Sequence, residues 1–497
     1  MTDKVVVSGN RLIVGYLGLF MIIIGVICMI PLFVIPFYSE EVVYAKCFII
    51  PAISSILFGY LLYYLVRNKD KARLANHEDA RLLLSVWIVA ILICSTPFLL
   101  SGQIDFISSV FESTSGFTTC GMSLLVPENL PHIFLFYRSL LLFFGGIGLV
   151  LVLASAISDK YGMKLYTAEG HSDKLVPNLM RSARLILSIY IIYIIIGTLA
   201  YVAFGMGWFD AINYAISSLS TGGFSTHSEG IKYFDSVGIE IVTIILMLLG
   251  STNFMVHLFL IKGKFKELKK HTEFKFACLV LGVSIAIMVA SICGEVGLWE
   301  ALRYSAFSAV SLITTTCYTS DFIGIFPQGM ILLFIFLVFI GGELGSTGGG
   351  LKRYRVALFF KNLWWSLKSR YADKRLIETH AMYRAGKKII ITNDEINENN
   401  AFIGWFLFVY ILGIALFVLG GMNVADAFIE FAGMITGAGI TQGVVTADSN
   451  ALILLTSACG MILGRLEVIL VLMLIAKSFN NIKRRLRKGE RESKGSK

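Results

Sequence analysis

Four short clusters of Thr, Gly and Ser recur along the chain, each between two long apolar stretches. The backbone of such clusters can do one kind of chemistry: carbonyl oxygens that point inward replace the hydration shell of an alkali cation, and glycine permits the φ angles that this requires. Four clusters at matching places predict a ring of cation ligands rather than ordinary tight loops. The predicted ligands are Thr114, Ser115, Gly116 and Phe117; Thr221, Gly222, Gly223 and Phe224; Thr315, Thr316, Cys317 and Tyr318; and Gly437, Ala438, Gly439 and Ile440.

A further run contains only Gly, Ser and Thr: Gly345, Ser346, Thr347, Gly348, Gly349 and Gly350. Glycine costs about 1 kcal/mol in a helix interior, so this run cannot hold a regular helix well. A broken helix beside a pore is an expected place of motion, which predicts a gate. The alternative is a surface of small residues for close helix packing, and both roles can hold for different glycines.

Arg465 lies near the middle of an apolar stretch, where a lone charge costs about 2.5 to 3.5 kcal/mol on insertion scales. It must therefore face protein or water. We consider two roles: Arg465 borders the inner pore, where it sets an electrostatic barrier or anchors the gate, or it forms a structural ion pair between helices. Glu467 points to a different helix face and is not the obvious partner.

The elements that carry these residues are membrane helices. Hydrophobic residues make up 56% of the 497-residue chain and charged residues 15%, which excludes a soluble protein of this length. Two leading spans precede four pairs of spans, each about long enough to cross a bilayer. The predicted spans are 11–37 and 45–66, then 82–100 with 133–157, 183–206 with 236–262, 276–294 with 328–345, and 401–421 with 450–477.

Each pair of spans brackets a shorter segment that leads into one of the four clusters. These segments, such as 210–219 and 426–435, have about ten residues, too few to cross the membrane, and are predicted to be re-entrant pore helices. Asp210 and Asp426 are predicted to cap them and to complement the positive end of the helix dipole. Non-helical backbone at membrane depth must line water or be buried in protein, so the four loops predict a central pore.

The net charge of +10 is explained by where Lys and Arg lie. They gather in alternate polar segments and are nearly absent from the others; the basic segments are 67–81, 160–184, 262–275, 352–388 and 477–497. This is the positive-inside pattern, which places both termini in the cytoplasm and needs no nucleic-acid partner. The eight cysteines show no metal-binding spacing and are expected to be buried small hydrophobic residues.

The clusters resemble degenerate forms of the potassium-channel filter sequence TVGYG, and their context resembles one superfamily. Residues 341–352, GGELGSTGGGLK, are similar to the GG-x-x-GSTGGG-x-K block of the TrkH, TrkG, KtrB and plant HKT transporters. Further similarities lie at 145–148, at Asn253 and His257, and at 460–467. The resemblance covers residues 82–480, and the two leading spans favour the TrkH branch.

The resemblance implies an all-α integral membrane protein: two leading transmembrane helices followed by four M1-P-M2 pore repeats around a pseudo-fourfold pore. It implies a homodimer in the cytoplasmic (inner) membrane of a prokaryote, with filter positions at Gly116, Gly223, Cys317 and Gly439. Lys352 joins the gate as the last residue of the matched block. The expected divisions are two leading helices and a cytoplasmic loop in 1–80, repeats in 81–160, 181–270, 271–352 and 401–480, a cytoplasmic linker in 353–400 and a basic tail in 481–497.

The function that the resemblance implies is channel-like uptake of potassium ions, with no catalytic residue. The gate is expected to be controlled by a cytosolic ring of TrkA-type subunits that bind a nucleotide, NAD or ATP/ADP. This chain has no nucleotide motif and needs no cofactor of its own, since potassium is its substrate. The basic residues 483–488 are expected to bind anionic membrane lipid or that ring.

Two alternatives remain open. One is a sodium-permeable or sodium-coupled transporter of the same superfamily. The other belongs to a different class: a membrane enzyme that uses Glu343, Glu467 and His257 as acid, base or metal ligands. It lacks a paired catalytic motif and leaves the four loops unexplained, and His257 alone is better read as a packing residue.

Two residues depart from the pattern of the family. Glu343 stands where the family usually has a small neutral residue, and a buried carboxylate needs a partner, for which Arg465 or Lys352 is expected. Cys317 stands at a glycine position, where its side chain hinders left-handed backbone angles by roughly 1 to 2 kcal/mol. The third wall of the filter is therefore expected to be irregular, with modest discrimination against sodium.

Overall fold

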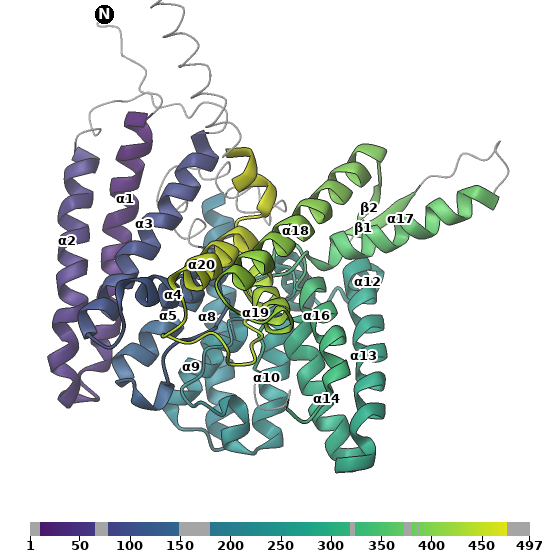
Figure 1. Cartoon of the computed structure of the whole chain (residues 1–497), viewed down its shortest axis with the longest axis horizontal. Helices are drawn as coiled ribbons and strands as arrows, with labels where there is room; N and C mark the ends of the chain where they lie inside the picture. The colour runs from purple at the N-terminus through teal and green to yellow at the C-terminus, as the bar shows by residue number, and fades with distance from the viewer. Residues whose placement is uncertain are drawn as a thin grey trace, which may run out of the picture.

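The computed structural model describes residues 10–64, 78–148, 179–318, 324–371, 380–384 and 387–474 (Figure 1). The tail from 475, the rest of the span predicted at 133–157, and most of the basic segments at 67–81 and 160–184 lie outside these residues. Two leading helices pack side by side at one edge of the protein; they are α1 (Asn10–Met29) and α2 (Ala45–Tyr64), joined by η1 (Ile30–Val34) and η2 (Ser39–Tyr44). Gly18 and Gly59 bring them together, because a Cβ at either would lie 2.5 to 2.6 Å from the carbonyl oxygen of the other.

Each of the four repeats begins with a long helix followed by a short one. The long helices are α3 (Glu78–Ser101), α8 (Leu179–Ala203), α13 (Thr272–Val296) and α18 (Asn393–Leu419). The short helices are α4 (Phe106–Phe117), α9 (Trp208–Leu219), α14 (Leu298–Ile313) and α19 (Val424–Thr436). With 12 to 16 residues, the short helices are about 18 to 24 Å long and cannot cross a hydrocarbon core of about 30 Å. They therefore enter and stop, as re-entrant helices do.

The N-terminal ends of the short helices are not capped as predicted. Asp210 and Asp426 lie within the first turn of α9 and α19, and the N-cap residues are Gly207 and Asn423. The capping role was wrong because each helix starts two residues earlier than the acid suggests. The carboxylates still lie in the turn where negative charge complements the helix dipole. Asp105 does cap α4, since its carboxylate accepts a hydrogen bond from the backbone N–H of Ser108 at 2.9 Å.

The second long helix of each repeat ends early or is broken. These helices are α5 (His132–Ile147), α10 (Val237–Gly250) with α11 (Phe254–Ile261), α16 (Ile331–Ile340), and α20 (Ala451–Arg465) with Val468–Leu474. The continuous spans predicted at 236–262 and 450–477 are wrong, because the chain bends there by 114° and 106°. At the first bend the Asn253 side chain accepts from the N–H of Met255 and starts a new helix. At the second, Glu467 has a φ of 59°, which a helix does not allow.

Apolar helices occur at all ten predicted spans, although they differ in length. Among the described residues, six helices are each long and apolar enough to span a bilayer. Each of the two bent pairs, α10 with α11 and α20 with Val468–Leu474, is long and apolar enough to span a bilayer if its two helices are counted as one span. Two further apolar helices are shorter, His132–Ile147 and Gln328–Ile340. In the described part of the chain, the helices long enough to span a bilayer therefore number six, or eight if each bent pair counts as one span.

The repeats close into a ring through contacts between neighbours. The second helix of each repeat packs on the short helix of the next: α5 on α9, α10 on α14, α16 on α19, and α20 back on α4. The last contact joins the fourth repeat to the first. This closed order confirms the predicted all-α fold, with two leading helices and four pore repeats about a common axis.

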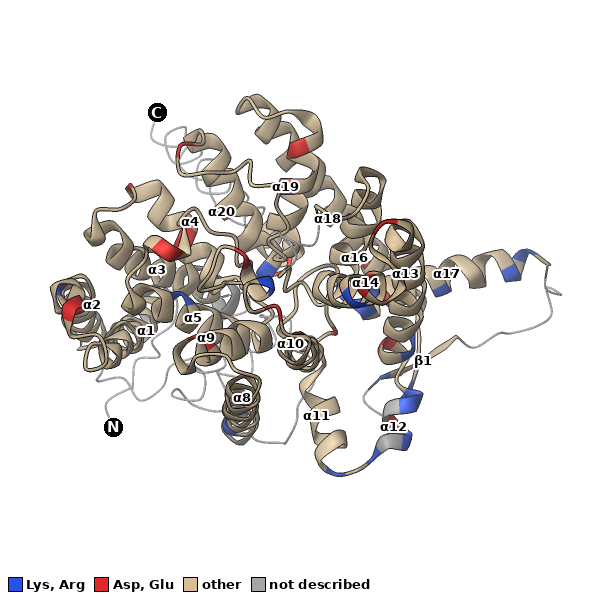
Figure 2. Ribbon diagram, turned by 90° about the horizontal axis from the view of Figure 1, so that it is seen from below, with Lys and Arg blue, Asp and Glu red and all other residues tan. Residues whose placement is uncertain are grey.

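The connections between repeats carry the remaining elements. They are η3 (Pro127–Asn129), η4 (Gly230–Phe234), α12 (Phe265–Lys270), η5 (Gln328–Met330), α17 (Arg353–Tyr371), and the antiparallel strands β1 (Ala381–Arg384) and β2 (Lys387–Ile390), which pair with Ala381 opposite Ile390. In the segment expected as a linker, 353–400, the described residues form α17, the β1–β2 hairpin and the start of α18, and α17 extends away from the ring (Figure 1). Lys and Arg residues gather on α12 and α17 (Figure 2), which connect successive repeats.

Candidate cation filter and gate

Four loops of five residues follow the short helices, at 118–122, 220–224, 314–318 and 436–440. In each loop the second and fourth residues have positive φ and the residue between them does not. The pairs are Thr119 (56°) and Gly121 (75°), Thr221 (51°) and Gly223 (76°), Thr315 (61°) and Cys317 (50°), and Gly437 (62°) and Gly439 (68°). The four loops therefore share one backbone geometry. We name them loops 1 to 4 in chain order.

Neighbouring loops are so close that only backbone fits between them. A Cβ placed on Gly121 would lie 1.6 Å from the oxygen of Gly222, one on Gly223 would lie 2.2 Å from that of Thr316, and one on Gly439 would lie 2.1 Å from that of Cys120. Each of these contacts joins one loop to the next around the ring. Carbonyl groups of one loop thus lie directly against the backbone of its neighbour, as a compact ring of carbonyl ligands requires.

The predicted position of the first loop is wrong. Thr114, Ser115, Gly116 and Phe117 form the last turn of α4, and the N–H of Thr118 donates to the carbonyl of Thr114 at 2.9 Å. The loop begins only after this turn, so its glycine is Gly121. Spacing is the signal that finds it: the N-cap residue precedes the fourth loop residue by 16 positions in repeats 1, 2 and 4. In repeat 3 the distance is 20, because α14 is one helical turn longer.

Loops 2 to 4 lie where the sequence places them, and Cys317 has the same backbone geometry as its glycine counterparts. Its φ of 50° is left-handed, at a cost of roughly 1 to 2 kcal/mol for a residue with a side chain. The expectation that this cysteine keeps the third loop out of the left-handed region is wrong. Loop 3 is held by the close approach of Gly223 to the Thr316 oxygen and by the hydrogen bond from Gly349 N to Thr315 Oγ1.

The fourth residues of all four loops line one cavity. Gly121, Gly223, Cys317 and Gly439 border a space of about 260 Å³, together with Arg138. A water molecule occupies about 30 Å³ in the liquid, so the cavity can hold several. The loops therefore open onto a single aqueous vestibule rather than onto four separate crevices.

Two buried glutamates form hydrogen bonds with the residues that follow loops 1 and 4, and neither glutamate was predicted from the sequence. Glu112 and Glu430 lie nine residues before Gly121 and Gly439, on α4 and α19. Each accepts from a hydroxyl and a backbone N–H just after its loop: Glu112 from Ser123 Oγ (2.8 Å) and Leu124 N (3.1 Å), and Glu430 from Thr441 Oγ1 (2.8 Å) and Gln442 N (2.8 Å). The signal was available, because an acidic residue inside a short apolar membrane segment needs a structural reason.

Arg138 on α5 balances the first of these glutamates. Its Nε lies 3.1 Å from Glu112 Oε1, both side chains are buried, and the guanidinium lies 4.2 Å from the centre of the Phe224 ring. The Arg138 side chain therefore joins the short helix of repeat 1 to loop 2. The pair helps to hold two walls of the ring at a fixed distance.

Breaking this pair should destabilise the protein strongly. We expect Arg138→Met to lower the free energy of unfolding by about 3 to 5 kcal/mol, because it leaves Glu112 buried without a countercharge. The double variant Glu112→Gln with Arg138→Met should recover much of the loss. Thermal unfolding of purified protein in detergent measures both, with Lys232→Met as a control, since Lys232 is exposed. Equal losses in the single and double variants would contradict the ion-pair explanation.

The loop at residues 341–352, which contains the predicted gate residues 345–350 and is called the gate loop below, lies directly against loops 3 and 4. The N–H of Gly349 donates to Thr315 Oγ1 at 2.7 Å, and the N–H of Gly350 donates to the carbonyl of Thr436 at 2.8 Å. A Cβ on Gly349 would lie 1.9 Å from the same Thr436 oxygen. The predicted break in the helix is confirmed, since α16 ends at Ile340. Close packing also occurs, as the alternative interpretation of this glycine run predicted.

Arg465 joins the gate loop to the first repeat. Its Nη1 donates to the carbonyl of Thr347 at 2.7 Å and to Thr119 Oγ1 at 3.3 Å, and its Nη2 donates to the carbonyl of Gly145. Of the two roles considered, these bonds fit the anchor of the gate. Lys352 donates to the carbonyl of Gly348 within the loop.

The space beneath the gate loop is small. Lys352 and Arg465 border a cavity of about 30 Å³, with residues of the loop as its other main wall. One water needs at least about 10 to 15 Å³ of such volume, so the cavity holds about two. The cavity of about 260 Å³ that loops 1 to 4 border is much larger.

Glu343 does not pair with Arg465 or Lys352, the two partners expected from the sequence. Its Oε2 accepts from the N–H of Asn253 at 2.9 Å, and its Oε1 lies 3.9 Å from Arg353 Nη1. The prediction was wrong because the gate loop turns Glu343 away from the axis, toward the bend between α10 and α11. The three residues of the enzyme hypothesis are likewise not brought together, since Glu467 pairs with Arg355 at 2.8 Å and His257 contacts Tyr193 at 3.3 Å.

Fold and site define the class: a multi-pass membrane protein in which four pore-loop repeats form one ring. Residues 45–483 match the TrkH family, described as cation transport protein, and the chain belongs to this family. The Trk system potassium uptake protein TrkH of Salmonella typhimurium is 31% identical over 497 residues, which cover 94% of this chain and 99% of that protein. TrkG of Escherichia coli K12 is 30% identical, over 90% and 94% of the two chains.

A solved structure agrees with these relatives. The crystal structure of the potassium transporter TrkH from Vibrio parahaemolyticus superposes with a TM-score of 0.82 at 26% identity, over 93% of this chain and 98% of that one. The matches confirm the family and the fold class predicted from sequence. The relatives are ion transport proteins, so this chain is a multi-pass membrane transporter of the Trk family and the enzyme hypothesis is wrong.

Proposed function

We propose that this chain is a channel-like potassium uptake protein whose loops 1 to 4 form the selectivity filter. The observation that carries the proposal is the ring of backbone contacts, in which a carbonyl of one loop lies against the left-handed residue of the next. Such a ring offers several carbonyl dipoles to one dehydrated cation. The names of the relatives support potassium as the substrate, since TrkH of Salmonella typhimurium and TrkG of Escherichia coli are both called potassium uptake proteins.

The filter residues follow from the corrected register. Loop 1 contributes Thr119, Cys120, Gly121 and Met122 in place of the residues at 114–117. The other walls are the predicted ones: Thr221, Gly222, Gly223 and Phe224; Thr315, Thr316, Cys317 and Tyr318; and Gly437, Ala438, Gly439 and Ile440. The gate comprises residues 345–350 with Lys352 and Arg465, and the hydrogen bonds that tie it to loops 3 and 4 support this role.

Regulation and assembly are part of the proposal. The chain works as a homodimer in the cytoplasmic membrane of a prokaryote, with both termini in the cytoplasm. A cytosolic TrkA-type ring that binds NAD or ATP/ADP controls the gate, and membrane lipid surrounds the helices. The Trk system names of the relatives support a partner subunit, and the Lys and Arg residues of α12 and α17 support the orientation.

A flux measurement tests the function and decides the sodium alternative. Purified protein in liposomes should carry potassium and rubidium ions down their gradients without any organic substrate. A bi-ionic measurement should show potassium to be more permeant than sodium, because four loops of equal geometry surround the ion. Equal permeability, or a flux that requires a sodium gradient, would favour the sodium-permeable or sodium-coupled transporter.

Cys317 gives a second test of the vestibule. Its side chain borders the cavity, so a small thiol reagent added from the outside should block the flux of the parent protein and leave Cys317→Gly unaffected. The potassium-to-sodium ratio of Cys317→Gly should stay near the parent value, because the backbone is already left-handed. Cys120→Ser is the matched control and should remain sensitive, since Cys120 is 1% exposed. A block that persists in Cys317→Gly would contradict the assignment of the vestibule.

A further inference from the structure

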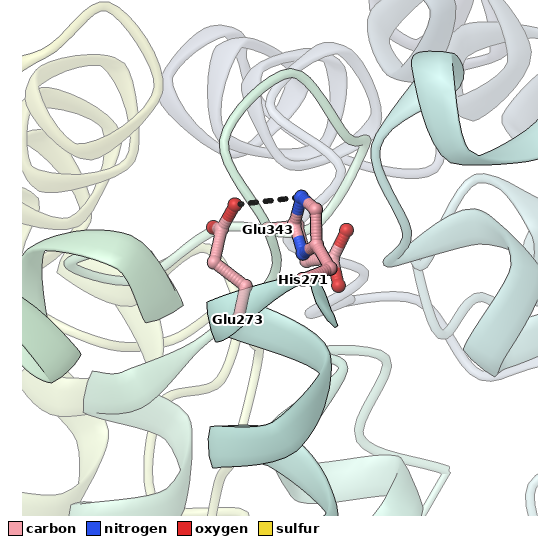
Figure 3. Close-up of side chains that lie close together, drawn as sticks. All are labelled: His271, Glu273 and Glu343. Atoms are coloured by element: carbon pink, nitrogen blue, oxygen red, sulfur yellow. Dashed lines mark ion pairs between the residues drawn. The ribbon is translucent and has the colours of Figure 1, made fainter. Parts of the chain in front are cut away.

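Three buried titratable side chains meet where the gate loop crosses the start of α13, outside the filter (Figure 3). His271 is the N-cap residue of α13, Glu273 lies in its first turn, and Glu343 belongs to the gate loop. One imidazole nitrogen and one oxygen from each carboxylate all lie within 4.8 Å of one another. Each of the three residues is only 1% exposed, so water does not solvate the two carboxylates.

The spacing inside this cluster is longer than hydrogen bonds and close to that of shared metal ligands. His271 Nε2 and Glu273 Oε2 are 3.8 Å apart, beyond hydrogen-bond length. Two atoms bound to zinc at about 2.1 Å and the tetrahedral angle are about 3.4 Å apart. Among the described residues, Glu273 Oε2 has no hydrogen-bond partner. A buried carboxylate oxygen in that state is costly, which points to a bound ligand.

The surrounding contacts orient the carboxylates and leave them able to bind. Glu273 Oε1 accepts from the N–H of Leu344 at 3.1 Å, and Glu343 Oε2 accepts from the N–H of Asn253 at 2.9 Å. Arg353 lies 3.9 Å from Glu343 Oε1, too far for a hydrogen bond, and its guanidinium donates instead to a backbone carbonyl and a serine hydroxyl. Glu273 Oε2 therefore keeps its lone pairs for a cation.

We propose that His271, Glu273 and Glu343 bind a divalent transition-metal ion of the zinc class, which locks the gate loop against α13. One imidazole and two carboxylates suit zinc, manganese or ferrous iron, whereas magnesium and calcium prefer oxygen ligands alone. Two ligands belong to a membrane helix and one to the gate loop, so the ion cross-links a fixed element to a movable one. The locking of the gate rests on the proposed function; the binding of the metal does not.

Calorimetric titration of the full-length protein in detergent with zinc chloride tests the site. We expect one zinc ion per chain, and at least about tenfold weaker binding in His271→Gln, Glu273→Gln and Glu343→Gln, since loss even of an outer partner of a ligand costs 10- to 100-fold. The matched controls His380→Gln and Glu467→Gln should keep the parent affinity, because His380 stacks on Trp365 and Glu467 pairs with Arg355. No zinc binding by the parent, or equal affinity in all variants, would overturn the proposal.

Thermal unfolding and flux separate the site from its effect. Zinc should raise the melting temperature of the parent and should not raise that of His271→Gln. This variant keeps both carboxylates, so it provides the test if either glutamate variant fails to fold. In liposomes, zinc should lower the rubidium flux of the parent and leave that of His271→Gln unchanged. Zinc-insensitive flux in a parent that binds zinc would refute the lock. Absence of any flux without zinc would contradict the proposed function, while calorimetry would still decide the metal site.

Discussion

Gly223→Val and Gly439→Val should each reduce potassium-dependent growth of an uptake-deficient host to the background level. A Cβ at these positions would lie 2.2 and 2.1 Å from carbonyl oxygens of the neighbouring loops, where real contacts are essentially never shorter than 3.0 Å. Both residues also have positive φ, which a β-branched side chain tolerates poorly. The substitution must therefore push two walls of the ring apart. Growth at low external potassium measures the effect.

Two glycines outside the ring serve as matched controls. Gly421 has a φ of 99°, and a Cβ there would have no neighbour within 4 Å, so Gly421→Val carries the penalty of the backbone angle without the contact between loops. Gly404 has no positive φ, and a Cβ there would have no neighbour within 4 Å, so Gly404→Val controls for expression. We expect clear uptake in both controls. Uptake at the parent level in Gly223→Val and Gly439→Val would show that these loops do not form the filter.

Deleting residues 348–350 should raise cation flux and make it insensitive to the cytosolic ring. The deletion removes the hydrogen bonds from Gly349 N to Thr315 Oγ1 and from Gly350 N to the Thr436 carbonyl. At about 1 kcal/mol each, their loss favours the open state by about 2 kcal/mol, or about thirtyfold in the equilibrium. Rubidium uptake into liposomes, with and without the ring, measures the change.

Ser346→Ala is the control for the deletion, because it changes the gate loop without shortening it. Arg465→Gln provides an independent measurement, since it removes the anchor to the Thr347 carbonyl and should also raise flux. Size-exclusion chromatography shows whether each variant is folded. Loss of folded protein without any rise in flux would favour a packing surface over a gate.

The spans, the four repeats and three of the four loops could be predicted because they depend on local patterns. Apolar length marks a membrane helix, and a Thr and Gly cluster after a short helix marks a loop. The position of loop 1 could not be found in this way, because Gly116 and Gly121 lie in two overlapping clusters that are both plausible. The choice depends on where α4 ends and on the contact between Gly121 and Gly222 across the ring.

The helix breaks and the partner of Glu343 depend on contacts that hydropathy does not record. The stretch from Val237 to Ile261 is apolar on both sides of its bend, and only Asn253 marks the new helix start. Glu343 meets residues from α13 and from that bend because the gate loop folds back over them. Such pairings follow from the path of the chain in three dimensions, which no spacing rule in the sequence contains.

The ring of loops has a consequence for how such a pore can evolve. In a pore made of four identical chains, one codon change alters every wall at once, and a harmful side chain is repeated four times. Here each wall is encoded separately, and Cys317 faces three glycines at the matching positions. A single mutation therefore changes one quarter of the surroundings of the ion. Selectivity can drift by small steps, each of which leaves three walls to preserve transport while the fourth is altered.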